Sequence, residues 1–263
     1  MVEWIRLARK RGLWADVLHA VFNLLFATLV VATVMFFPDT PWPALLLVLL
    51  SKWRVLAVRP RYWWNNILSS LPDLVMGLGM VVLMWQAGVL GSAVAMMAWP
   101  MQIVLGAFYA FWLIWLKPQH KHKLILVQSG VSQFVGLMAI FGVAYLLPLW
   151  AVVGLAFIVS FAAARQILGL HEEKDQTLLA LIWGLAVSQL AFAAWHWTVA
   201  YQITPLLRVP QMAIVIAVLS FVAERAYAGW HNDHKIQWHE VQVSVIFAIA
   251  VIGLLVVGFG GLF

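Results

Sequence analysis

Apolar runs of about twenty residues alternate with short polar segments along nearly the whole chain. A helix needs about 20 mainly apolar residues to cross the hydrocarbon core of a bilayer. The runs lack the strict apolar-polar alternation of outer-membrane barrel strands. The pattern therefore predicts an all-α polytopic membrane protein with about nine transmembrane helices, at 17–37, 43–58, 67–88, 92–116, 124–146, 149–169, 177–201, 210–229 and 241–262.

The composition agrees with a membrane protein that has no soluble domain. Apolar residues make up 65% of the chain and charged residues 10%, against about 45–50% and about 25% in an ordinary soluble domain. We expect one transmembrane bundle over 17–263. Residues 1–16 mix basic and aromatic side chains in a helical pattern, which predicts an amphipathic segment on the cytoplasmic membrane surface. A frayed basic tail is the alternative for this segment.

Charge is distributed unevenly over the segments between the runs. Arg208 lies alone in one segment, and the other 15 Lys and Arg residues fall in 6–11, 52–61, 117–123, 165–174 and 225–235. Cytoplasmic loops of membrane proteins keep positive charge. The distribution predicts an integral protein of the plasma (inner) membrane, with the N-terminus in the cytoplasm and the C-terminus outside. The net charge of +6 predicts anionic membrane lipids as partners, and not nucleic acid.

Similar short motifs recur along the second half of the chain. Residues 160–165 (SFAAAR) resemble 220–225 (SFVAER), and a Gly-x-His motif follows each copy. The offset between matching positions grows from 56 to 60 residues, which predicts a small insertion in an outer turn. We interpret the chain as four hairpins and a final helix, with chance similarity between apolar helices as the alternative. The predicted units are 17–58, 67–118, 122–171, 177–231 and 241–262.

Polar side chains inside the apolar runs are candidates for a site. Asp73 is the only acid placed well inside a run, and an intramembrane carboxylate is costly unless it faces protein or water. It is interpreted as a proton or cation site, or alternatively as a neutral carboxyl or a helix cap near Pro72. Amide and hydroxyl groups at a similar depth predict a polar cavity shared with Asp73, or simple hydrogen bonds between helices: Gln128, Ser132, Gln133, Ser188 and Gln189.

Arginine residues gather where the runs meet the basic segments. Such side chains extend to lipid phosphates at the membrane surface, and the alternative is a vestibule for an anionic head group or substrate. Aromatic residues beside the first three make an anionic-lipid site a further hypothesis. The residues concerned are the arginines Arg54, Arg59, Arg61, Arg165 and Arg225, together with the acidic Glu224.

Catalytic and cofactor motifs are missing from the sequence. The chain has no cysteine and no HExxH motif, and the run 241–262 has no Lys that could hold retinal. His171, His231 and His234 are the one grouping considered for a metal. No catalytic residue and no cofactor is therefore predicted.

Three classes of function remain after these exclusions. A transporter, channel or lipid-translocating protein with a polar cavity on the cytoplasmic side fits the polar groups best. A non-catalytic membrane subunit or assembly factor, packed against a membrane partner or a second copy of the chain, is the alternative. An intramembrane lipid-modifying enzyme is the third hypothesis.

Overall fold

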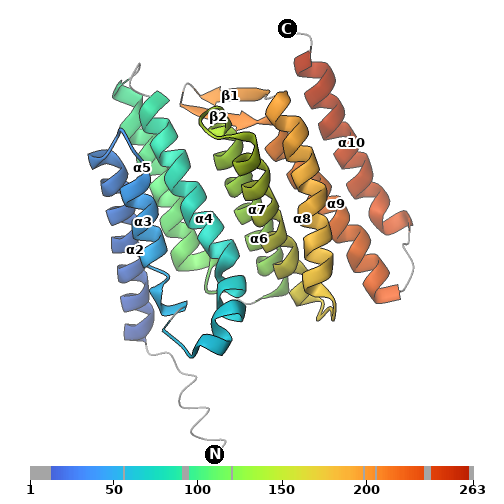
Figure 1. Ribbon diagram of the computed structural model, residues 1–263, viewed down its shortest axis with the longest axis horizontal. Helices are drawn as coiled ribbons and strands as arrows, with labels where there is room; N and C mark the ends of the chain where they lie inside the picture. The colour runs from blue at the N-terminus through green and yellow to red at the C-terminus, as the bar shows by residue number, and fades with distance from the viewer. Residues whose placement is uncertain are drawn as a thin grey trace, which may run out of the picture.

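The computed structural model describes residues 13–55, 57–90, 95–119, 121–197, 199–204, 206–233 and 238–260. Nearly all of these residues are helical, and the long helices lie side by side in one bundle (Figure 1). The first twelve residues of the predicted amphipathic segment lie outside the described residues.

The first half of the bundle places one long helix among shorter elements. Its elements are α2 (Leu13–Phe36), α3 (Trp42–Leu50), the 3₁₀ turns η1 (Trp53–Val55) and η2 (Pro60–Tyr62), α4 (Trp63–Leu90), α5 (Ala95–Phe111) and the π-helical turn η4 (Trp112–Leu116). Of these, α4 packs against α2, α3, α5 and also α6 and α7, so it is the central helix of the bundle.

The second half consists of long helices and one small sheet. Its elements are α6 (His122–Gly142), the 3₁₀ turn η5 (Ala144–Leu146), α7 (Leu149–Leu170), α8 (Gln176–His196), β1 (Ala200–Thr204), β2 (Leu207–Pro210), α9 (Gln211–Asp233) and α10 (Trp238–Gly260). Helix α10 packs mainly against α9 at the edge of the bundle (Figure 1).

Seven of the described helices are long and apolar enough to cross a membrane, which is compatible with a multi-pass membrane protein. The predicted span 43–58 is not one continuous helix, because α3 has nine residues. At 1.5 Å per residue it is about 14 Å long, against a hydrocarbon core of about 30 Å. The helix ends where Ser51 and Lys52 follow the apolar run. In α10 the described apolar stretch is Val241–Val257, so the predicted count of nine is not confirmed.

The connection between the predicted spans 177–201 and 210–229 is an antiparallel hairpin of β1 and β2, so the chain is not purely α-helical. Ala200 pairs with Pro210, and Tyr201 with Val209. Leu206 and Val209 are buried, which anchors the hairpin on the helices below it. The Tyr201 hydroxyl also donates a hydrogen bond to the Leu255 carbonyl of α10, at 3.2 Å.

The two ends of the bundle differ in charge. Helix α2 begins at one end, and α10 ends at the other (Figure 1). We call the end where α2 begins the basic end, because the described residues of the segments 52–61, 117–123 and 165–174 lie there, and we call the opposite end the hairpin end. Arg208, on strand β2, lies instead at the hairpin end.

Candidate functional site: a polar cavity beside α4

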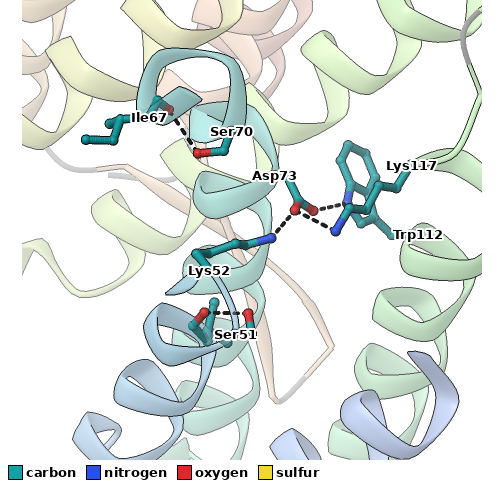
Figure 2. A network of polar contacts seen from close by, with 8 residues as sticks. Ser51, Lys52, Ile67, Ser70, Asp73, Trp112 and Lys117 are labelled. Atoms are coloured by element: carbon teal, nitrogen blue, oxygen red, sulfur yellow. Dashed lines mark hydrogen bonds and ion pairs between the residues drawn. The ribbon is translucent and has the colours of Figure 1, made fainter. Parts of the chain in front are cut away.

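Asp73 lies at the centre of a charged network built from three separate elements (Figure 2). Lys52, which follows α3, donates to Oδ2 of Asp73, and Nζ of Lys117 lies 2.8 Å from the same oxygen. The indole Nε1 of Trp112 donates to Oδ1 at 3.2 Å. The side chains of Lys52 and Asp73 are each only 17% exposed. One carboxylate therefore binds two ammonium groups and an indole N–H in a largely buried position.

Local backbone structure brings these side chains together. Helix α3 stops early, and the Ser51 hydroxyl donates to the Val48 carbonyl at 2.6 Å, which leaves Lys52 at the level of Asp73 (Figure 2). The Lys117 N–H bonds to the Trp112 carbonyl at 2.8 Å, across the π-helical turn η4. Such turns are rare and are frequent at functional sites. The turn places Trp112 and Lys117 on the same side of the helix, facing α4.

The capping hypothesis for Asp73 is wrong, because α4 begins at Trp63 and continues through Pro72. Asp73 therefore lies more than two turns inside a helix. The backbone N–H groups that a cap would bind are free only in the first turn, so the Asp73 carboxylate does not cap α4. Its partners are side chains of other elements.

A polar cavity of about 580 Å³ surrounds this network at the basic end. Its lining contains three cationic side chains, Lys52, Arg54 and Lys117, and one acidic side chain, Asp73. Lys117 is 41% exposed, so the cavity is accessible from outside the bundle. The other lining residues are Ser51, Val55, Asn66, Ser69, Ser70, Pro72, Trp112, Gln119, Ile125, Gln128 and Gln166.

Two glutamines form the wall of the cavity opposite α4. Gln128 donates to the carbonyls of Leu116 and Gln119, the latter at 3.1 Å, and so fixes the turn between η4 and α6. Gln166 of α7 donates to Oε1 of Gln128 at 3.4 Å. The Gln166 Oε1 atom is buried and has no hydrogen-bond partner in the described part of the chain. The wall thus offers amide groups beside the charged network.

The other residues predicted to share this cavity do not line it. Ser132 and Gln133 are buried in helix packing, where Ser132 donates to the Ser129 carbonyl and Gln133 to the Ser160 hydroxyl. Ser188 donates within its own helix to Leu185, at 2.7 Å. Gln189 is exposed on the surface of α8. The structure therefore brings together Asp73 and Gln128, and leaves the rest of the predicted polar layer outside the cavity.

Close packing closes the bundle between this cavity and the hairpin end. Met76, Met80 and Met84 follow Asp73 on α4 and are almost fully buried. A Cβ atom at Gly77 would lie 2.8 Å from Cγ1 of Val48 and 2.9 Å from the Tyr109 hydroxyl oxygen. The described residues therefore leave no room for a continuous polar path along this part of α4.

A second polar cavity, of about 340 Å³, lies at the hairpin end. Gln86 of α4 lines it and donates to the Gly142 carbonyl of α6 at 2.8 Å. Arg208 supplies its positive charge. The remaining lining residues are Phe141, Gly142, Ala144, Tyr145, Trp195 and Ala200. Polar cavities thus occur at both ends of the α4–α6 pair.

The predicted arginine sites separate in the structure. Arg54 lines the Asp73 cavity, whereas Arg59 and Arg61 are exposed in the connection before α4, and the Arg61 guanidinium lies 4.6 Å from the centre of the Tyr62 ring. Two others lie toward the basic end of α7 and α9: Arg165, whose Nε is buried without a partner in the described part of the chain, and Arg225, which lies 3.8 Å from Glu224.

A separate cluster joins the α7–α8 turn to α9. The Tyr227 hydroxyl donates to Oε2 of Glu173, and Nδ1 of His231 lies 3.7 Å from that oxygen. The His171 ring contacts His231 and also His122, with ring centres 5.4 and 5.5 Å apart. Burial lowers the pKa of His171, and the neighbouring His122 and His231 lower it further. The hydrogen bond from Tyr227 lowers the pKa of Glu173.

Two of the three histidines named as a candidate metal site lie in this cluster. His171 and His231 lie in it, while His234 lies outside the described residues. Within the described ranges, no three His, Cys, Asp or Glu side chains are arranged to hold a metal ion.

Comparison with protein-family models, with curated proteins and with solved structures gives no match for this chain. Sequence reasoning selected Asp73, Gln128 and Arg54 but missed Lys52, Trp112 and Lys117. The available signal was a Lys at the end of an apolar run: Lys117 follows its run directly, and Lys52 follows after Ser51.

Proposed function

We propose that the protein is a membrane transporter, and that its substrate binds in the cavity around Asp73. The observation that carries this proposal is the pair of polar cavities at opposite ends of α4 and α6, with tightly packed apolar side chains between them. A carrier of this kind opens its site to one side of the membrane at a time. The larger cavity also has the volume of ordinary small-molecule sites, about 300–1,000 Å³.

The packing between the cavities is suited to rearrangement. The barrier contains three methionines of α4, Met76, Met80 and Met84. Methionine is unbranched and flexible, so it repacks more readily than branched side chains. Small residues let α4 and α6 approach closely, since a Cβ atom at Gly79 would lie 3.0 Å from Val135 of α6. Movement of α6 along α4 would exchange these contacts and open the barrier from the hairpin end.

The proposal includes a topology of nine crossings, with the N-terminus cytoplasmic. Supporting it, α2 begins and α10 ends at opposite ends of the bundle, as an odd number requires. The second crossing would be made by α3 together with η1 and η2. We also propose that α6–α7 and α8–α9 are copies of one unit, although equivalent positions differ in environment: Ser132 is buried and Ser188 half-buried.

Cysteine accessibility tests the transport proposal, because the chain contains no cysteine. Met80→Cys is placed in the barrier, and Gly154→Cys, on an exposed position of α7, is its matched lipid-facing control. In oriented vesicles, a membrane-impermeant thiol reagent is expected to modify Met80→Cys from either side, and Gly154→Cys from neither. Modification from one side, or from neither, contradicts alternating access.

A static membrane subunit is the second candidate. It is favoured by the polar groups satisfied inside the helix packing, where Ser129 donates to the Ala163 carbonyl at 2.7 Å and Gln133 to Ser160 at 3.2 Å. A solid core of this kind would leave Met80→Cys unmodified from both sides, so the same experiment separates the two functions.

A further inference from the structure

We propose that the basic-end cavity binds a phosphate monoester group, and that Asp73 acts as an internal counter-ion at the position the phosphate takes. This inference rests on the proposed function, in which this cavity is the substrate site. It assigns the substrate a chemical class, and it assigns Lys52 and Lys117 as the residues that bind it.

The charge of the cavity is unbalanced without an anion. The cavity lining contains Lys52, Arg54 and Lys117 against one acid, Asp73, an excess of two positive charges. Lys52 and Lys117 contact Asp73, and Arg54 is exposed. Uncompensated charge inside a membrane protein is costly, and such groups mark substrate or ion pathways. A phosphate monoester carries about 1.5 to 2 negative charges at pH 7, which balances this excess.

The donors of the network converge as they would on a small oxyanion. Both ammonium groups meet one carboxylate oxygen, Oδ2, and the Trp112 indole donates to the other. Lys52 follows α3, whereas Trp112 and Lys117 come from the η4 turn, so the chain itself preorganises the donors around Asp73 of α4 (Figure 2). Carboxylate and phosphate oxygens accept from the same donors, and lysine binds phosphate as a point charge. Asp73 therefore occupies a place that a phosphate oxygen fits.

The cavity wall offers further groups to such a ligand. Asn66 lines it from α4 with an amide donor, whereas the Ser69 and Ser70 hydroxyls, which also line it, donate to the Asn66 and Ile67 carbonyls. The Gln166 amide donates to Gln128, and its buried Oε1 atom has no partner in the described part of the chain, so this oxygen can accept only from a ligand group that carries a proton, such as a hydroxyl group of the ester. A phosphate has several acceptor oxygens, so one of them can accept from the Asn66 amide after the two lysines are bound.

The same geometry argues against the cation site considered from the sequence. Two ammonium groups already surround the Asp73 carboxylate. A metal ion or organic cation would have to displace both and would then face their repulsion together with that of Arg54. The site is thus built for an anion that competes with Asp73 for the two lysines.

A phosphate monoester can come from a soluble metabolite or from a lipid head group. An apolar groove of about 610 Å³ runs along another face of α4, from Leu71 to Trp85, and is also lined by α6 and α7. Such a groove would accommodate an acyl chain. The shared chemistry is the phosphate group, and the two sources are separated by the experiment.

The test measures binding of inorganic phosphate to the purified full-length chain in a phosphate-free neutral detergent, by isothermal titration calorimetry. Asp73→Asn keeps the side-chain shape but removes the competing charge, so the affinity for phosphate is expected to rise about tenfold, or about 1.4 kcal/mol. Lys52→Gln and Lys117→Gln are each expected to weaken binding at least tenfold. Asp175→Asn and Lys123→Gln make the same charge changes at exposed positions outside the cavity and are expected to change little.

Several results would overturn the inference. One is that neither the unmodified chain nor Asp73→Asn binds phosphate. Another is that Asp73→Asn binds phosphate more weakly than the unmodified chain. A third is that Lys123→Gln weakens binding as much as Lys52→Gln does. Should Lys52→Gln fail to fold because Asp73 loses a partner, the double variant Lys52→Gln/Asp73→Asn removes the pair together. It is expected to bind phosphate more weakly than Asp73→Asn alone, and equal affinity contradicts a role for Lys52.

Competition then identifies the source of the phosphate. Glycerol phosphate and phosphatidic acid in mixed micelles are compared as competitors of inorganic phosphate. Stronger competition by phosphatidic acid indicates a lipid head group, and equal competition indicates a soluble phosphate. Phosphate binding without two-sided modification of Met80→Cys would leave an anion site in a protein that is not a carrier. Two-sided modification without phosphate binding would leave a carrier for a different substrate.

Discussion

Single glycines set how closely α4 approaches its neighbours just above the Asp73 cavity. Gly77 faces Val48 of α3 and Tyr109 of α5, and both are almost fully buried. Tyr109 also contacts Phe26 of α2, with ring centres 6.4 Å apart. The position of Lys52, four residues after Val48, therefore depends on a contact that only glycine permits.

Gly77→Ala is expected to lower the free energy of unfolding by about 1–3 kcal/mol, the usual cost of overpacking a core. The new Cβ atom would lie 2.8 Å from Val48 and 2.9 Å from Tyr109. The control is Gly130→Ala, whose Cβ atom meets nothing within 4 Å. That change should stabilise the helix by roughly 0.5–1 kcal/mol, because alanine loses less backbone freedom. Denaturant unfolding in detergent measures both, and equal effects would contradict the packing argument.

Elements at the basic end are joined by titratable side chains rather than by apolar packing alone. Glu173 in the α7–α8 turn holds Tyr227 and faces His231, both on α9. His171, at the end of α7, touches His122 of α6 and the same two residues of α9. The cluster thus connects three helices through groups whose charge depends on pH.

Acidification is expected to destabilise this junction. The pKa of His171 is lowered in the folded protein, so on acidification its imidazole is protonated at a higher pH in the unfolded chain than in the folded one. The free energy of unfolding therefore falls as the pH drops below about 6.5. The pKa of Glu173 is also lowered, so its contribution is lost at still lower pH, as the pH falls through its folded-state value.

Thermal unfolding between pH 7.5 and 5.5 measures this effect. His171→Gln should flatten the decrease in melting temperature over that range, whereas His19→Gln, at an exposed position of α2, should leave it unchanged. A decrease of the same size in His171→Gln would show that other groups cause it.

The whole bundle combines an unequal charge distribution with helices that start and end at opposite faces. The cavity with the larger positive charge lies at the basic end, and the smaller cavity with Arg208 lies at the hairpin end. Positive charge is retained on the cytoplasmic side of membrane proteins. The Asp73 cavity is therefore expected to open to the cytoplasm.

Reporter fusions test this orientation. A reporter active only in the cytoplasm is expected to be active when fused before residue 1 or in the segment 172–175, and inactive when fused after Phe263. The fusion in the α7–α8 turn is the internal control, since that turn belongs to the basic end. Activity after Phe263 would require an even number of crossings and would contradict the nine-crossing topology.

The sequence by itself determined the class of protein and the basic end. Apolar runs decide whether segments enter a bilayer, and charged loops decide their orientation, so both are readable without tertiary contacts. The same local argument selected Asp73, because a carboxylate inside an apolar run needs a partner. Gln128 was also selected, and it does line the cavity.

Only the tertiary structure decided what Asp73 meets and which polar residues share its cavity. Lys52 and Trp112 are 21 and 39 residues away in the chain, and their approach depends on where α3 ends and on the π-helical turn before Lys117. Ser188 and Gln189 match Ser132 and Gln133 in sequence, yet they lie on a helix with different neighbours. A polar side chain on an apolar helix shows that a partner is needed, but the packing of the other helices determines which face is covered.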